Sequence, residues 1–206
     1  MKDFVDESCR DFAAMLASSS PAPGGGGAAA LSAALGAALG EMVAALTLGK
    51  KSYIQVEGEI LAAARELEQL RRRLLGMVQE DARGFEPLAA VYRLPKDSPQ
   101  REDMLEAATL KACQAPVEIM ELGCRALELL AVMAEKGSRL AVSDAGCAAA
   151  LLKAALDCAA LNVYINTASL KDRESARELN SRCIRMQERW GAEAERVYSS
   201  VKEKLL

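Results

Sequence analysis

Apolar residues recur every three or four positions along most of the chain, which is the spacing of one face of an α-helix. Amphipathic helices are predicted over 4–18, 52–77 with a continuation to 92, 101–113, 116–135 and 172–204. Gly84 and Pro87 predict a kink or a restart before Tyr92, and Pro116 is predicted to open a new helix, because proline lacks a backbone N–H. No segment alternates between apolar and polar residues as a half-buried β-strand does.

Two further helices, over 27–48 and from Ser143 or Asp144 to Thr167, are rich in alanine and apolar on every side. This pattern favours an enclosed position in a bundle over a membrane span, because the first of them is largely Ala and Gly and carries Glu41. We expect Ser143 or Asp144 to cap the second helix and Gly49 to end the first. The predicted fold is a single all-α domain over 1–206, a multihelical bundle around a buried central Ala/Gly-rich helix.

The segment Pro21-Ala22-Pro23-Gly24-Gly25-Gly26-Gly27 stands immediately before the first of these apolar helices. Two prolines stop the preceding helix, and glycines leave the backbone N–H groups uncovered. A loop of this kind at a helix N-terminus suits an anion or a polar ligand edge. It matches neither a P-loop nor the GxGxxG of dinucleotide-binding folds, so we expect Gly24, Gly25, Gly26 and Gly27 to bind something other than a nucleotide phosphate.

Composition excludes several kinds of chemistry. The chain has 206 residues, a net charge of −3 and no histidine, which rules out a Ser-His-Asp triad and histidine-based acid–base catalysis and leaves no expected metal site. An acidic chain offers no bulk attraction for nucleic acid or an anionic membrane. Six cysteines without a CxxC pair, and an N-terminus without a signal-peptide core, indicate reduced thiols in a cytoplasmic protein.

Two acids and two amides are candidates for a site, each with a structural alternative. Asp81 lies within a helix beside an apolar stripe, where it is either a boundary residue paired with a cation such as Arg83 or a functional acid. Asp144 is either a simple helix cap or a functional acid. Asn162 and Asn166 share one face of an apolar helix. Buried amides need hydrogen-bond partners, so these two are either structural, bonded within the protein, or directed at a ligand.

Three short basic groups complete the candidate residues. Lys50 and Lys51 follow the first apolar helix, where their charges complement the negative end of its dipole, but they also suit a carboxylate ligand. Arg71, Arg72 and Arg73 lie on the polar side of a long amphipathic helix, which is typical of a solvated face.

The order of these motifs resembles the cyclodeaminase/cyclohydrolase family of folate enzymes. The matching segments are, in order, Pro21–Gly26, Glu41–Lys51, Asp81–Ala82 with Phe85, Arg93–Lys96, Val142–Ala145 and Asn162–Asn166. The family usually has serine after the three glycines, and this chain has Gly27. A ligand bound at that position would therefore be held through the backbone alone.

The resemblance implies a helical bundle that works as a homodimer or larger assembly on a tetrahydrofolate derivative, with no metal and no permanently bound cofactor. A cyclohydrolase opens 5,10-methenyltetrahydrofolate to 10-formyltetrahydrofolate, whereas a cyclodeaminase closes 5-formiminotetrahydrofolate to the methenyl form and releases ammonia. A chain without an attached formiminotransferase domain favours the cyclohydrolase. A non-catalytic folate-binding bundle is the remaining alternative.

The resemblance also suggests roles for the candidate residues. Asp81 and Asp144 are expected to stabilise the cationic one-carbon bridge and to transfer protons. Asn162 and Asn166 are expected to orient the pterin or the reacting water. Lys50, Lys51 or the glycine N–H groups are expected to meet the glutamate carboxylates of the folate.

Overall fold

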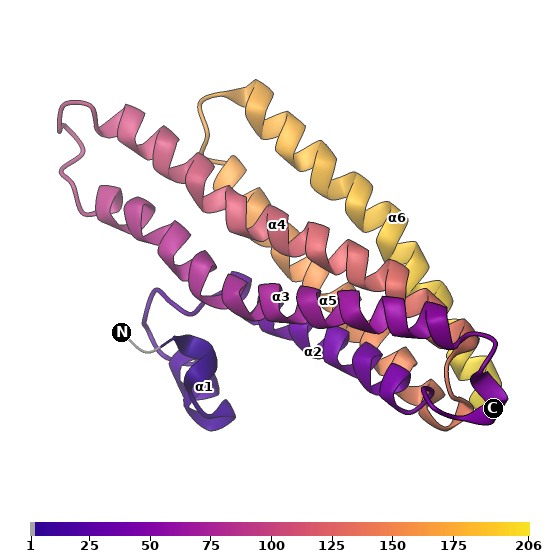
Figure 1. Ribbon diagram of the computed structural model, residues 1–206. Coiled ribbons are helices and arrows are strands. Elements are labelled where there is room, and N and C mark those ends of the chain that lie inside the picture. Colours follow the sequence, from indigo (N-terminus) through magenta and orange to yellow (C-terminus); the bar gives the residue numbers. More distant parts are fainter. Residues whose placement is uncertain (1–2) are drawn as a thin grey trace.

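The computed structural model describes residues 3–206, and every regular element in that range is a helix (Figure 1). The α-helices are α1 (Cys9–Leu16), α2 (Gly25–Ala45), α3 (Glu57–Tyr92), α4 (Arg101–Lys136), α5 (Val142–Thr167) and α6 (Arg173–Leu205). Of three short 3-10 helices, η1 (Phe4–Asp6) precedes α1, η2 (Lys51–Tyr53) lies between α2 and α3, and η3 (Arg139–Ala141) lies between α4 and α5. The predicted all-α bundle is confirmed.

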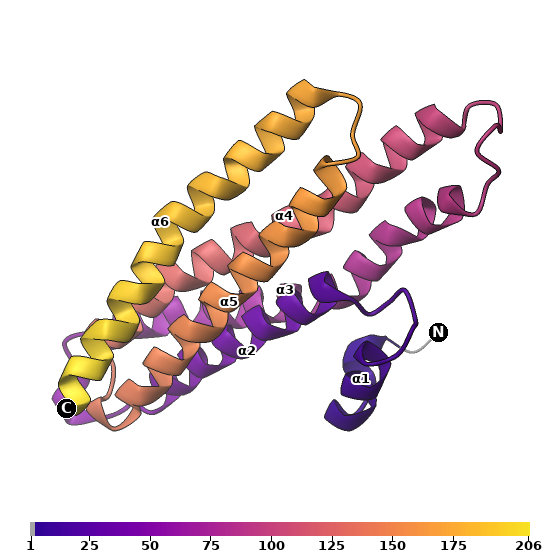
Figure 2. The same ribbon diagram turned by 180° about the vertical axis from the view of Figure 1, so that it is seen from behind.

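The helices form a layered bundle in which α2 and α5 lie side by side. They are antiparallel, because Gly25 at the start of α2 lies beside Asn162 near the end of α5, and Gly36 lies beside Leu152 farther along. α3 and α4 form a longer hairpin that runs past the start of α2 (Figure 1). α6 packs along the other side of α5 (Figure 2).

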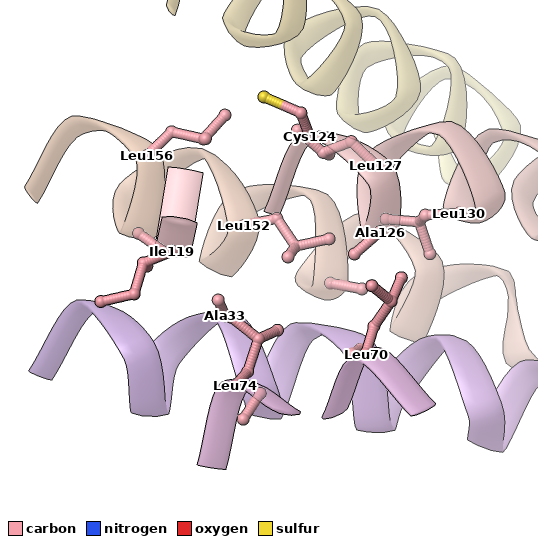
Figure 3. Close-up of a cluster of buried hydrophobic side chains, with 14 of the residues drawn as sticks. Ala33, Leu70, Leu74, Ile119, Cys124, Ala126, Leu127, Leu130, Leu152 and Leu156 are labelled. Atoms are coloured by element: carbon pink, nitrogen blue, oxygen red, sulfur yellow. The ribbon is translucent and has the colours of Figure 1, made fainter. Parts of the chain in front are cut away.

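The core is built mainly from alanine and leucine of α2, α3, α4 and α5, part of which Figure 3 shows, and α6 adds smaller side chains to it. Glycines on α2 let the helices approach closely. A Cβ at Gly36 would lie 2.7 Å from Cγ of Leu152, and one at Gly40 would lie 2.9 Å from Cδ1 of Leu67. The small residues of α2 are therefore a packing requirement, since larger ones would separate the helices.

The outward sides of α2 and α5 remain apolar and exposed. We call this surface the α2–α5 face. Its exposed members are Leu35, Met42, Leu46, Cys147, Ala150, Ala154, Cys158, Leu161 and Ile165. By length and composition alone, the segments Gly25–Ala45 and Arg139–Thr167 are each apolar enough to cross a membrane, and 50% and 44% of their most apolar windows are buried in the bundle. The central Ala/Gly-rich helix is thus covered on its inner sides and open on its outer side.

Pro116 does not open a new helix, contrary to the prediction from the sequence. α4 runs without interruption through it, as α3 runs through Pro87. A proline inside a helix leaves the carbonyl four residues earlier without its usual donor. Here that carbonyl, on Ala112, accepts a hydrogen bond of 3.4 Å from Nδ2 of Asn166 on α5. A side chain from another helix thus satisfies the group that Pro116 leaves unpaired.

Several helix ends also differ from the predictions. α5 begins at Val142 with Ala141 at its cap position, so Asp144 lies within the first turn and is not the cap. α2 ends at Ala45, and Gly49, with a φ of 74°, lies in the following turn and is not the C-cap. Asp172 does cap α6, because its carboxylate accepts from the N–H groups of Glu174 and Ser175.

Candidate active site

A small cavity of about 150 Å³ lies where α2 begins, at the point where α3, α4 and α5 pass its first turn. Six of the residues predicted to form a site line it together: Gly24, Gly25, Gly26, Asp81, Asn162 and Asn166. The remaining lining residues are Pro21, Ala22, Ala82, Phe85, Ala112, Pro116 and Ile165. Residues far apart in the sequence therefore meet at one helix N-terminus.

The contact between Gly26 and Asp81 defines the centre of this cavity. A Cβ on Gly26 would lie 2.2 Å from Oδ1 of Asp81, 2.5 Å from its Cγ and 2.6 Å from Oδ2. No side chain fits in that space, so the carboxyl group lies directly against the backbone of the first helical turn. The glycine at position 26 is required for this close approach.

The environment of Asp81 works in two directions on its acidity. Burial raises the pKa of the carboxyl group above its ordinary value, and a hydrogen bond from the backbone N–H of Gly27 partly offsets this. The positive end of the α2 dipole also favours the ionised form. Asp81 is thus a half-buried acid with no cationic partner among residues 3–206, and its raised pKa is typical of groups that exchange protons in catalysis.

Asn162 and Asn166 both line the cavity. Nδ2 of Asn162 donates to the carbonyl of Cys158 at 2.8 Å, and Nδ2 of Asn166 donates to the carbonyl of Ala112. Both amide nitrogens are thus held by the protein, and within residues 3–206 neither Oδ1 has a hydrogen-bond donor. The structural role is therefore observed, and each side chain still has an acceptor oxygen that a ligand could use, so the ligand-binding role stays a prediction.

The polar groups of the cavity are therefore mainly acceptors. The Asp81 carboxylate and the amide oxygens of Asn162 and Asn166 accept hydrogen bonds, while the N–H groups of Gly25 and Gly26 have no partner in the described chain. Among residues 3–206, no lysine or arginine lines the cavity. Such a site favours a cationic, hydrogen-bond-donating ligand, with two backbone donors for one polar edge of it.

Of the other predicted site residues, Gly27 is not in the cavity lining, although its N–H bonds to Asp81, and three lie elsewhere. Asp144 is in the first turn of α5, eighteen residues before Asn162, and a helix rises by about 1.5 Å per residue, so about 27 Å separate them. Lys50 and Lys51 follow the far end of α2, where Nζ of Lys50 donates to Oγ of Ser138 at 3.2 Å. Within one chain, these three residues do not belong to the Asp81 cavity.

Pro116 and Ala112 also line the cavity and were not predicted to do so from the sequence. The available signal was a proline, Pro116, within an otherwise helical pattern. Larger cavities exist, including one of about 700 Å³ between α3, α4 and α6. Its charged lining residues include Arg125 and Arg182, which are paired with glutamates. We place the site at the smaller cavity because, among residues 3–206, its carboxyl group has no cationic partner and its two amide oxygens have no hydrogen-bond donor.

The fold and the cavity together define a class of protein: an all-α bundle with a half-buried carboxyl group against a glycine-rich helix N-terminus. A family model described as formiminotransferase-cyclodeaminase matches residues 8–185. The chain belongs to this family, as its motifs predicted.

Individual relatives also support the assignment to this family. A methenyltetrahydrofolate cyclohydrolase of Methylorubrum extorquens is 39% identical over 204 residues, which cover 97% of this chain and 98% of that protein. The formimidoyltransferase-cyclodeaminase of Gallus gallus is 30% identical over 191 residues, covering 91% of this chain but 35% of that protein. A crystal structure of formiminotetrahydrofolate cyclodeaminase from Thermotoga maritima matches with a TM-score of 0.82 and 30% identity, covering 96% of this chain and 94% of that one.

Proposed function

We propose that the protein is a methenyltetrahydrofolate cyclohydrolase in which Asp81 is the catalytic acid–base group. The observation that carries the proposal is the half-buried Asp81 carboxyl group, held against the first turn of α2 in a cavity lined by acceptors. The methenyl bridge of the substrate is a cationic amidinium. A carboxylate without a competing cation would stabilise that charge and the transition state for water addition.

The proposed reaction balances around one water molecule. As the water oxygen bonds to the bridge carbon, the Asp81 carboxylate accepts a proton from the water. The tetrahedral intermediate then breaks its carbon–N5 bond, and Asp81 returns the proton to N5, which leaves the formyl group on N10. The second water proton goes to solvent. The raised pKa of Asp81 suits both halves of this exchange, since the group must accept and then release a proton.

The test is a paired assay on one preparation, with 5,10-methenyltetrahydrofolate and 5-formiminotetrahydrofolate as separate substrates. The cyclohydrolase predicts loss of the methenyl absorbance above its spontaneous rate and no ammonia release from the formimino compound. Ammonia release with methenyl formation would instead favour the cyclodeaminase, the activity named for the Gallus gallus and Thermotoga maritima relatives. Binding without either reaction would indicate a non-catalytic folate-binding bundle.

We further propose that the protein is a homodimer in which the α2–α5 face of one subunit packs on that of its partner. The exposed members of the face are all uncharged, and apolar surfaces that gather on one side of a protein mark interaction sites. A two-fold axis that lies in the plane of this face and crosses α2 and α5 at a right angle would bring the Asp144 end of each subunit toward the Asp81 end of the other. In that arrangement Asp144, Lys50 and Lys51 of one subunit would lie near the Asp81 cavity of its partner, and both subunits would contribute to each site.

Leu161→Glu, which places a charge on this surface, is expected to convert the dimer to a monomer, as measured by light scattering during size-exclusion chromatography. Ile184→Glu is the matched control, because Ile184 is a 46% exposed apolar residue on α6. A wild-type monomer, or equal effects of both variants, would contradict the proposed interface.

We also propose that the protein acts in the cytoplasm without a permanently bound cofactor. All six cysteines are free thiols. Burial raises the pKa of Cys113 to about 11 and that of Cys124 to about 12, so both thiols remain protonated and unreactive at neutral pH. Mass spectrometry of the purified native protein, expected at the mass of the polypeptide alone, tests the cofactor part.

A further inference from the structure

The Asp81 cavity is too small for a whole folate. Its volume is about 150 Å³, whereas pockets for molecules of this size measure roughly 300–1,000 Å³. It has room for part of the bicyclic pterin and the one-carbon bridge. If the proposed function holds, the benzoyl ring and the glutamate of the substrate must lie on another part of the surface.

A second cavity of about 280 Å³ adjoins the first. The two share four lining residues, Pro21, Ala22, Ala82 and Phe85. The two cavities therefore adjoin at these residues, and we call the second one the second chamber. Most of its lining residues belong to the C-terminal half of α3. The end of α3 extends beyond the start of α2 (Figure 1).

We propose that this second chamber is the subsite for the aminobenzoyl-glutamate arm of the substrate, with Arg93 as the residue that binds the glutamate carboxylate. Asp81, Phe85, Ala89 and Arg93 are spaced four residues apart on α3 and its C-cap, so they form one stripe along the helix. The stripe is about 18 Å long at about 1.5 Å per residue. An arginine side chain reaches back over part of that length, which leaves a span comparable to the arm.

The lining of the chamber suits such an arm. Phe4, Phe85, Ala89 and Pro21 supply apolar surface for an aromatic ring. The N–H of Phe4 donates to Oε1 of Gln79 at 3.3 Å, which holds the N-terminal 3-10 helix at the chamber wall. The Nε2 of Gln79 has no partner within residues 3–206 and is available to an amide carbonyl of the ligand.

Two exposed charges of opposite sign line the chamber. Arg93 has no carboxylate partner in the described part of the chain, so its guanidinium is free to bind a carboxylate. Glu86, two helical turns before Arg93, carries a charge that would repel the same ligand. The subsite therefore predicts opposite effects from removing the two charges.

The experiment compares substrates with and without the glutamate. With methenyltetrahydrofolate, Arg93→Ala is expected to raise KM about threefold to tenfold with little change in kcat, the size of effect typical of an exposed ion pair with an arginine. With methenyltetrahydropteroate, which lacks the glutamate, the same variant should match the wild type. Glu86→Gln should lower KM for the glutamate-bearing substrate about twofold. Arg72→Ala, at an exposed arginine of α3 paired with Glu68, is the control and should change neither.

Titration with tetrahydrofolate, which is not turned over, gives a dissociation constant that is independent of catalysis. Weaker binding to Arg93→Ala than to Arg72→Ala would support the subsite even if the wild type proved inactive on methenyltetrahydrofolate, a result that would defeat the proposed function alone. An active wild type whose Arg93→Ala variant keeps the same KM and dissociation constant would overturn the subsite and leave the function standing. An equal rise in KM for both substrates in Arg93→Ala would also overturn the subsite, because the effect would not depend on the glutamate.

Discussion

Gly26→Ala is the substitution that tests the centre of the site most sharply. Its Cβ would lie 2.2 Å from Oδ1 of Asp81, whereas ordinary contacts begin at 3.4 Å. The carboxyl group must therefore retreat by about 1.2 Å, the difference between these two distances. A displacement of about 1 Å in a catalytic group can cost about 10²-fold in rate. We expect kcat to fall by about that factor.

The stability change should be much smaller than the change in rate. Overpacking costs about 1–3 kcal/mol, and replacing glycine by alanine in a helix returns up to about 1 kcal/mol. The net loss of about 0–2 kcal/mol corresponds to a fall in Tm of no more than about 8 °C in a domain of this size. Circular dichroism on heating measures the stability, and decay of the methenyl absorbance measures the rate.

Gly58→Ala is the matched control, because Gly58 occupies the same second position of α3 that Gly26 occupies in α2. A Cβ at Gly58 meets nothing within 4 Å, so this variant should keep both the rate and the stability of the wild type. The reasoning would be refuted if Gly26→Ala turned over substrate as fast as Gly58→Ala while folding normally.

Two other substitutions give independent predictions. Asp81→Asn should raise the Tm at pH 7–8 by up to about 2–4 °C. Burial raises the pKa of the Asp81 carboxyl group in the folded state, so the folded protein loses stability as the pH rises from the unfolded pKa to the folded pKa of this group, and asparagine avoids that loss. In thermal scans the gain should vanish at a pH below the unfolded value, about 3.9, and a gain that persists there would point to another cause. Asn162→Ala removes an acceptor from the cavity and should raise KM about tenfold with a smaller effect on kcat, whereas an unchanged KM would exclude Asn162 from substrate binding.

Much of the fold was predictable because helical periodicity is a local property. The pattern identified α6 within a few residues and the extent of α3, though not its unbroken run through Pro87, and the apolar character of α2 and α5 placed both in the bundle. It did not reveal that their outer sides are exposed, since a helix that is apolar all round carries no mark of which side is covered. Pro116 shows the limit of local rules, because the donor that satisfies the Ala112 carbonyl comes from Asn166, on another helix.

The candidate site was predictable in its residue types but not in its grouping. Gly26 and Asp81 are widely separated in the sequence, and only the packing of α2 on α3 shows that a side chain at position 26 would collide with the carboxyl group. Asp144 was grouped with Asp81 by the order of motifs. The length of α5 separates the two within one chain, because a helix is a rigid rod whose ends cannot meet.

The most direct test of the account is the rate at which the wild type and Asp81→Asn hydrolyse 5,10-methenyltetrahydrofolate, corrected for spontaneous opening of the bridge. The account predicts a wild-type rate well above that background and a fall of about 10²–10⁴-fold in the variant, with its helical signal intact. An active wild type matched by a folded Asp81→Asn of similar rate would contradict the assignment of Asp81 as the catalytic group.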